Sequence, residues 1–275
     1  MQAGGAANTS DRPRKWDWAL VTGASSGIGR AIAERLAADG VNLVLVARRA
    51  EKLAEVAAAT QTQHNIRTEI ITADLADQSQ RDVVEARLGA EQNAIDLLVN
   101  SAGGGLAGNL ITHTVQQRNY EAELNCVSVL RLCHAAATAM TRHGGGTILN
   151  MASGLGYYSC PGVATYCASK AFVLNLSATL RYELRGTGVG VTVVSPGPTD
   201  TDAAALAGVD LRIPRFLLAP ATQVAEVAIS AASRGKAMEQ VNAWNAALTL
   251  AHLAPARFSQ PVLHRIFRRV TRAAK

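Results

Sequence analysis

Short apolar runs alternate with helix-like segments along most of this 275-residue chain. Residues 42–47 (NLVLVA) and 189–195 (VGVTVVS) are nearly continuous Val/Leu runs, in which apolar and polar positions do not alternate. Such runs are typical of parallel strands that are buried on both faces of a sheet. The expected strands cover residues 16–22, 42–47, 67–73, 95–100, 147–152 and 189–195, and the expected helices cover 28–38, 49–63, 78–90, 114–142 and 164–185. This order predicts a single α/β domain, a doubly wound parallel sheet with helices on both faces.

Composition supports a globular protein with a large core, because hydrophobic residues make up 48% of the chain and charged residues only 17%. No apolar run reaches the roughly 18–20 residues that a membrane-spanning helix needs. Residues 1–15 lack the apolar stretch of a secretion signal, so we expect a disordered leader and a cytoplasmic protein. None of the four cysteines forms a C-x-x-C pair, which favours reduced thiols that pack as small apolar side chains and excludes an obvious metal motif.

The net charge of +6 lies entirely in the C-terminal tail. After Glu239 the chain contains no acidic residue and six basic ones: Arg257, Arg265, Arg268, Arg269, Arg272 and Lys275. Residues 1–239 are therefore formally neutral, and no aromatic-rich basic patch suggests nucleic-acid binding. The apolar residues of 261–275 recur at helical spacing, which predicts a basic amphipathic helix. We expect residues 255–275 to dock on the domain formed by 16–254 or on a second subunit; peripheral contact with an anionic membrane is the alternative.

A glycine-rich turn, TGASSGIG, joins the first expected strand to the first expected helix. Glycines permit a tight turn, and a helix N-terminus offers free N–H groups and a positive dipole to a pyrophosphate. The position between a strand and a helix is the context that such a motif requires. The expected contacts are Gly23, Ser25, Ser26, Gly27, Ile28 and Gly29.

The spacing T-G-x-x-x-G-x-G resembles that of the short-chain dehydrogenase/reductase family, whose domain is a Rossmann fold. Further motifs follow in the family's order: Asp74 and Leu75, then N-S-A-G at 100–103, Asn125, Ser153, Tyr166-x-x-x-Lys170, and Pro196 with Gly197. Only Ser101 departs from the family's N-N-A-G motif, and Asn100, Ala102 and Gly103 are retained. The resemblance implies a nicotinamide cofactor that also contacts Thr199 and Thr201.

The second strand ends in Arg48 and Arg49, where NAD-binding proteins usually carry an acidic residue for the ribose 2′-hydroxyl. Guanidinium groups can instead bind a 2′-phosphate through two parallel hydrogen bonds. We therefore expect NADP(H), with Arg48 as the first phosphate ligand and with help from Arg49, Ser25 and Ser26.

Tyr166 and Lys170 are four residues apart on an expected helix, so they lie on one face about a turn apart. A nearby ammonium stabilises a phenolate, which lowers the tyrosine pKa and makes proton transfer feasible near neutral pH. The family resemblance adds Ser153 as a hydrogen-bond partner of the substrate oxygen and Asn125 as the holder of a water that links Lys170 to solvent. Cys160 and Cys167 flank this site, and one of them could be reactive.

Residues 202–220 occupy the place of the family's substrate lid and are rich in apolar side chains. They favour an apolar ketone, aldehyde or oxoacyl substrate, although the same residues could simply dock the lid on the body. We expect an NADP(H)-dependent oxidoreductase that interconverts a carbonyl compound and its alcohol, as a homodimer or homotetramer. An NAD-linked alcohol dehydrogenase working oxidatively, or an NADP-binding regulatory protein without activity, are the alternatives.

Overall fold

The computed structural model describes residues 16–201, 209–211, 218–241, 261, 265 and 271–273. The expected leader, residues 1–15, lies outside these ranges. Most of the expected lid and most of the tail also lie outside the described residues.

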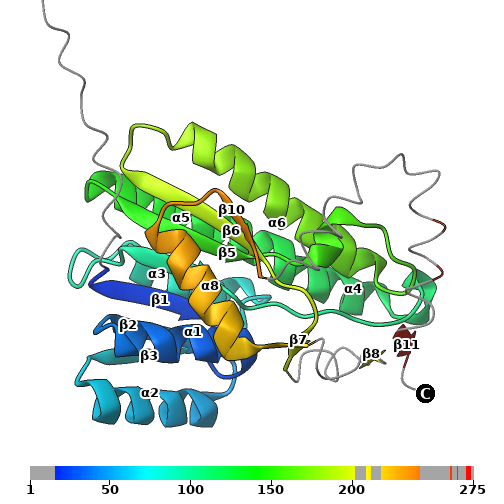
Figure 1. Cartoon of the computed structure of the whole chain (residues 1–275), viewed down its shortest axis with the longest axis horizontal. Helices are drawn as coiled ribbons and strands as arrows, with labels where there is room; N and C mark the ends of the chain where they lie inside the picture. The colour runs from blue at the N-terminus through cyan, green and yellow to red at the C-terminus, as the bar shows by residue number, and fades with distance from the viewer. Residues whose placement is uncertain are drawn as a thin grey trace, which may run out of the picture.

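A seven-stranded parallel sheet, in the order β10-β6-β5-β4-β1-β2-β3, forms the centre of the described domain (Figure 1). Its strands are β1 (Trp18–Thr22), β2 (Asn42–Ala47), β3 (Thr68–Thr72), β4 (Leu97–Asn100), β5 (Gly146–Met151), β6 (Val189–Ser195) and β10 (Met238–Gln240). The apolar runs at β1, β2, β4, β5 and β6 are almost completely buried, as their continuous hydrophobicity requires. The strand order reverses between β1 and β4, where open α/β sheets bind ligands at the carboxyl ends of their strands. The predicted fold class is confirmed.

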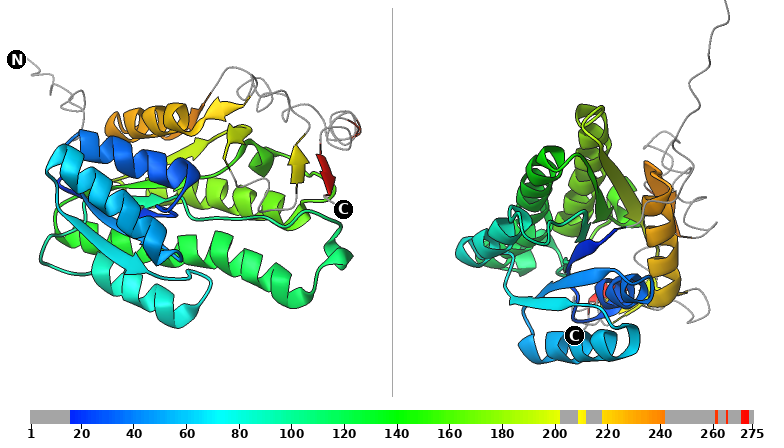
Figure 2. Two further views of the ribbon diagram at one scale, coloured as in Figure 1. Left: turned by 90° about the horizontal axis from the view of Figure 1, so that it is seen from below. Right: turned by 90° about the vertical axis from the view of Figure 1, so that its left-hand side faces the viewer.

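Helices cover both faces of the sheet, as the three views in Figures 1 and 2 show. α1 (Gly27–Ala38), α2 (Ala50–His64) and α8 (Ala221–Ser233) pack on one face and share a hydrophobic core that includes Leu36, Val56 and Ile229. α3 (Gln78–Leu88), α5 (Ser128–Arg142) and α6 (Ala164–Glu183) pack on the other face, around a core that includes Leu132 and Val173. No helix in the described part of the chain is long and apolar enough to cross a membrane.

The helix expected over 114–142 is present, and its backbone stays helical throughout, but it contains one π-helical segment. It consists of α4 (Val115–Ala122), a π-helical segment η2 (Glu123–Val127) and α5. A capping box of Thr114 and Gln117 begins α4. Single π-helical turns inside longer helices often mark functional sites, and this one contains Asn125.

Short elements surround the carboxyl end of the sheet. They are η1 (Leu110–Thr112), η3 (Gly154–Tyr157), β7 (Thr199–Asp200) paired with β9 (Ala219–Pro220), and β8 (Val209–Leu211) paired antiparallel with β11 (Thr271–Ala273). The helix predicted for 261–275 is therefore wrong at Thr271–Ala273, because these residues form a strand whose backbone pairs with β8. This pairing joins the end of the chain to the expected lid.

Candidate active site

The turn between β1 and α1 brings backbone N–H groups to the carboxyl end of the sheet. Gly23 has a φ of +69°, and a side chain there would meet the backbone of Ala102 at 3.0 Å. A side chain on Gly29 would collide with the carbonyl of Gly23. The Thr22 hydroxyl accepts hydrogen bonds of 3.0 Å from the N–H groups of Ser101 and Ala102, which ties the turn to the end of β4. Because α1 begins without a side-chain cap or an acidic residue in its first turn, its first N–H groups can bind a phosphate.

Arg49 lies beside this turn. Its Nη2 atom donates hydrogen bonds to Ser26 Oγ at 2.7 Å and to Ser25 Oγ at 3.1 Å. One guanidinium and two hydroxyls therefore gather at the position expected for a 2′-phosphate, and all three groups can donate hydrogen bonds to an anion.

Arg48 points to different partners. Its Nη1 donates to the Tyr120 hydroxyl at 2.7 Å, and that hydroxyl donates to the Asp74 carboxylate at 2.9 and 3.1 Å. The guanidinium of Arg48 is 3.9 Å from the same carboxylate. From the sequence we ranked Arg48 above Arg49 as a phosphate ligand, but Arg49 is the arginine that contacts the turn. Tyr120 carried no motif signal and was not expected in this group.

Three of the expected cofactor residues have side chains in the protein interior. Leu75 is buried in the core between the sheet and α3, and Ile28 packs partly buried against the core on the opposite face. Asn100 Nδ2 donates to Asn150 Oδ1 on β5 at 2.9 Å and to Cys133 Sγ on α5 at 3.4 Å. These side chains shape the scaffold, so any contact they make with a cofactor would run mainly through their backbone.

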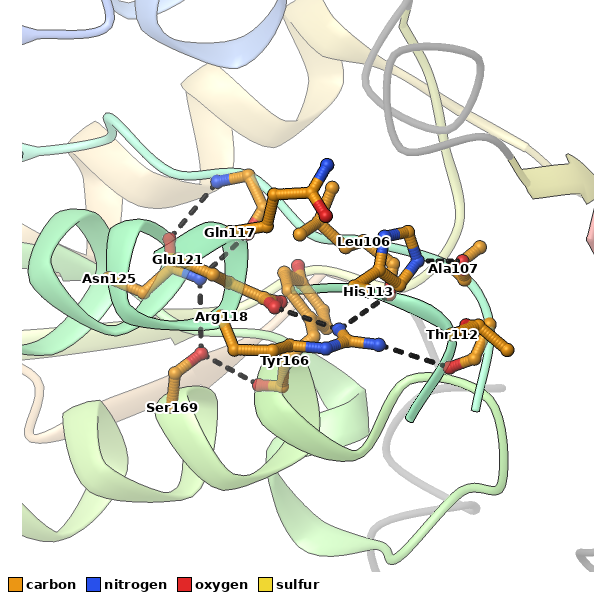
Figure 3. Close-up of polar contacts among 12 residues, drawn as sticks. Leu106, Ala107, Thr112, His113, Gln117, Arg118, Glu121, Asn125, Tyr166 and Ser169 are labelled. Carbon is orange, nitrogen blue, oxygen red and sulfur yellow. Dashed lines mark hydrogen bonds and ion pairs between the residues drawn. The ribbon is translucent and has the colours of Figure 1, made fainter. Parts of the chain in front are cut away.

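Asn125 joins three parts of the site, as Figure 3 shows. Its Nδ2 donates to the Gly104 carbonyl at 2.6 Å and to Ser169 Oγ at 3.2 Å, while its Oδ1 accepts from the Gly104 N–H at 3.0 Å. Ser169 in turn donates to the Tyr166 carbonyl at 2.8 Å. The π-helical segment, the loop after β4 and helix α6 are thereby held together.

Ser153, Tyr166 and Lys170 converge where β5 ends and α6 begins. The Ser153 side chain interacts with the Tyr166 hydroxyl and lowers its pKa, and Ser153 Oγ accepts from the Leu155 N–H at 3.2 Å. Lys170 Nζ lies 5.7 Å from the centre of the Tyr166 ring and donates to the Met151 carbonyl at 3.0 Å. The expected catalytic residues are therefore gathered in one place.

Gly103 completes this group on the side of the glycine-rich turn. A Cβ atom on Gly103 would lie 3.1 Å from Asn125 Oδ1 and 3.4 Å from Lys170 Nζ. Gly103 follows Ala102, which packs against Gly23. The loop after β4 therefore connects the glycine-rich turn to the cluster of Ser153, Tyr166 and Lys170.

Burial is the largest influence on the pKa values of Tyr166 and Lys170. Desolvation raises the pKa of Tyr166, and its interaction with Ser153 opposes this rise. Desolvation likewise lowers the pKa of Lys170 to about 8. From the sequence we expected the lysine charge to lower the phenol pKa, but in this structure the desolvation of Tyr166 outweighs any such effect. Burial therefore favours the protonated form of this phenol.

The segment after β6 closes over the glycine-rich turn. Pro196 is buried, and its carbonyl accepts from the Gly154 N–H at 3.0 Å. The Thr199 hydroxyl donates to the Gly197 carbonyl at 3.0 Å, and Thr201 Cγ2 would lie 3.2 Å from a Cβ atom on Gly27. This places the expected nicotinamide segment between the turn and Ser153.

Cys160 and Cys167 lie side by side near Tyr166, and both are buried. The hydrogen bond between their thiols raises the pKa of Cys160, with burial adding to the rise, and lowers the pKa of Cys167. Across the residues that the structure covers, no group of His, Cys, Asp and Glu side chains could hold a metal ion.

A buried ion pair beside Tyr166 is the largest feature that sequence reasoning missed (Figure 3). Arg118 Nη1 lies 3.1 Å from Glu121 Oε2, and the two side chains are only 9% and 2% exposed. Their i, i+3 spacing on α4 is common on solvated helix faces, so nothing in the pattern indicated burial.

Comparison with known proteins agrees with this geometry. The family profile of the short chain dehydrogenases matches residues 17–210. A sulfoacetaldehyde reductase of Chromohalobacter salexigens is 37% identical over 188 residues, which cover 68% of this chain and 74% of that protein.

Solved structures of similar fold are also dehydrogenases. A short-chain dehydrogenase from Sphingobium yanoikuyae in complex with NADPH superposes with a TM-score of 0.80 at 33% identity, over 90% of this chain and 95% of that one. The bulky-bulky ketone specific alcohol dehydrogenase from Comamonas testosteroni gives a TM-score of 0.74 at 34% identity, over 82% of this chain and 85% of that one. With its glycine-rich turn, its Ser153, Tyr166 and Lys170 cluster and these matches, the chain belongs to the short-chain dehydrogenase family.

Proposed function

We propose that this protein is an NADPH-dependent reductase of carbonyl compounds in which Tyr166 is the general acid. The observation that carries the proposal is the convergence of Ser153, Tyr166 and Lys170 at the carboxyl end of the sheet. A proton donor and a second hydrogen-bonding hydroxyl there are suited to a carbonyl oxygen that becomes an alkoxide.

The chain's residues fit NADPH. Gly23 and Gly29 leave no room for side chains beneath the first turn of α1, so a pyrophosphate can approach the backbone there. Arg49 with Ser25 and Ser26 would hold the 2′-phosphate. The NADPH complex of the Sphingobium relative supports this choice.

The bound cofactor would supply a hydride to the carbonyl carbon. Ser153 and Tyr166 would donate hydrogen bonds to the carbonyl oxygen, and Tyr166 would then transfer its proton to the alkoxide. Lys170 would supply positive charge that stabilises the resulting phenolate, and would hold the cofactor ribose, as the family resemblance implies. Asn125 fixes the backbone that carries Tyr166 and Gly104. In reverse, the same groups would oxidise an alcohol.

We propose an apolar ketone, aldehyde or oxoacyl compound as the substrate. Ten apolar residues between positions 204 and 218 support this class, because a lid of that composition favours an apolar ligand and excludes water. The ketone specificity named for the Comamonas relative points the same way.

An absorbance assay with purified protein tests the proposal. NADPH and NADH would each be offered with a panel of bulky ketones, aldehydes, sugars and oxoacyl thioesters, and NADP and NAD with the matching alcohols. We expect NADPH consumption with an apolar carbonyl compound and little reaction with sugars. A clear preference for NAD with an alcohol would favour the oxidative alternative, whereas tight NADPH binding without turnover across the panel would favour a regulatory protein.

We also propose that the protein acts in the cytoplasm as a homodimer or homotetramer. Light scattering coupled to gel filtration would give the subunit number directly.

A further inference from the structure

Arg118 and Glu121 bury two opposite charges on α4. Buried ion pairs add little net stability, because the loss of hydration offsets the attraction between the charges. When one partner is removed, however, the other is left unpaired at a large cost. A pair of this kind is therefore better suited to fixing a local geometry than to stabilising the fold, and its remaining contacts show which geometry.

Arg118 holds the loop that follows β4. Besides Glu121, its guanidinium donates to the carbonyls of Leu106 at 3.1 Å, Gly108 at 3.3 Å and Asn109 at 3.2 Å. The planar fork of an arginine can reach several carbonyls at once, whereas a lysine ammonium is a point charge. In the same loop, His113 Nε2 is hydrogen-bonded to the Ala107 carbonyl at 2.7 Å.

The beginning of this loop packs on the catalytic ring. A Cβ atom on Gly105 would have three nearest neighbours, all of them in Tyr166: Cδ2 at 3.0 Å, Cγ at 3.3 Å and Cβ at 3.5 Å. The backbone of Gly105 therefore lies next to Tyr166, with less room between them than a methyl group needs. A shift of the loop must move the ring or open a gap beside it.

Glu121 adds an electrostatic effect at the same place. Its carboxylate opposes ionisation of the Tyr166 phenol, in the same direction as burial. The charged and titratable groups near this ring include Lys170 and Cys167 on α6, Cys126 in η2, Arg118 and Glu121 on α4, and His113 after the loop.

We propose that Arg118 and Glu121 are positioning residues that fix Tyr166 through the 104–109 loop. This inference rests on the proposed role of Tyr166 as the catalytic acid. Arg118 fixes the distance between the loop and the Tyr166 ring through its hydrogen bonds to the loop carbonyls. Glu121 fixes the position of Arg118, and its negative charge favours the protonated phenol.

Gly105→Ala tests the contact without removing a charge. The added methyl group must displace the ring, so we expect kcat to fall by about ten- to a hundredfold, while the Kd of NADPH stays within about twofold of wild type because the phosphate-binding turn is untouched. Gly89→Ala is the matched control: it adds the same methyl group after α3, where the nearest atoms are 3.6 and 3.8 Å away. Its kcat should equal that of the wild type.

Arg118→Lys and Glu121→Gln separate geometry from charge. Arg118→Lys keeps the positive charge but loses the planar guanidinium that bonds several loop carbonyls at once, so kcat should fall as in Gly105→Ala. Glu121→Gln removes the negative charge, so Tyr166 should ionise at a lower pH than in the wild type. Tyrosinate absorbance after rapid pH jumps measures this ionisation without any substrate, with Tyr166→Phe versions as blanks.

The outcomes are distinct. A lower kcat in both Gly105→Ala and Arg118→Lys at unchanged NADPH affinity, with earlier ionisation in Glu121→Gln, supports the inference. Normal kcat in both variants and an unmoved Tyr166 titration would overturn it and leave the proposed function intact. If the wild type reduces no compound of the panel, the proposed function fails, and the titration in Glu121→Gln still decides whether the pair acts on Tyr166.

Discussion

The Nη2 atom of Arg49 lies 2.7 Å from the hydroxyl of Ser26, so the end of β2 and the turn before α1 are joined at one point. In a sheet of this strand order, that point faces the ribose of a dinucleotide. A cation at this place, with two serine hydroxyls beside it, favours a phosphorylated ribose over a free 2′-hydroxyl.

Cofactor preference should therefore depend on Arg49. We predict that Arg49→Ala weakens NADPH binding by about tenfold, as expected for one charge-assisted hydrogen bond, and leaves NADH binding unchanged. Arg48→Ala should have a smaller effect, because Arg48 is engaged by Tyr120 and lies near Asp74. Fluorescence titrations with both cofactors would measure these constants. Equal affinity of the wild type for NADPH and NADH would contradict the assignment.

The proton donor can be tested by removing a single oxygen. Tyr166→Phe should abolish turnover, since the ring stays in place and the acid is lost, and NADPH should bind nearly as before. Lys170→Ala should impair both binding and turnover. Steady-state kinetics with cofactor titration would separate the two effects, and a Tyr166→Phe protein with near-normal kcat would refute the role of Tyr166.

The pH dependence of carbonyl reduction should follow the ionisation of Lys170. Burial lowers its pKa to about 8, whereas burial raises that of Tyr166. Below pH 8 the lysine is charged and can stabilise the phenolate; above it the charge is lost while the phenol is still protonated. The kcat/KM for carbonyl reduction should therefore fall as pH rises through about 8. In Lys170→Arg, which stays charged, the fall should move to higher pH; an unmoved fall would assign it to another group.

Much of the fold follows from local pattern, because strands such as 42–47 are buried on both faces and their apolar runs are continuous. β10 was missed, since Met238–Gln240 is a short strand at the sheet edge with no apolar run. The predicted cluster of Tyr166 and Lys170 depends only on helical spacing. The π-helical turn at Asn125 depends on a local shift of backbone hydrogen bonds, which leaves no periodic signal.

The choice between Arg48 and Arg49 could not be predicted, because it depends on which side chain turns toward the serines. The burial of Arg118 and Glu121 could not be predicted from the sequence either. It follows from the path of the loop above α4, and a charged pair on a helix is more often exposed.

The end of the chain should act on the lid. β11 pairs along its length with β8, which lies within the expected lid at 202–220, so removal of 271–275 takes away the hydrogen-bonding partner of that strand. We predict that this truncation raises the KM for the carbonyl substrate, with little change in the Kd of NADPH, whose expected site is on the body of the domain. Kinetics on the truncated and full-length proteins would measure both constants.

Removing all of residues 255–275 separates docking on protein from attachment to a membrane. If the tail docks on its own domain or on a second subunit, as the β8–β11 pairing favours, the deletion should lower the melting temperature or change the subunit number. Affinity for anionic vesicles should then be low and unaffected. An interfacial anchor would behave differently: the full-length protein would sediment with anionic vesicles, and salt would weaken this, because exposed charges are screened over about 10 Å at 0.1 M. Salt-sensitive sedimentation that vanishes on deletion, at constant melting temperature and subunit number, would show that the six basic residues serve a membrane surface instead.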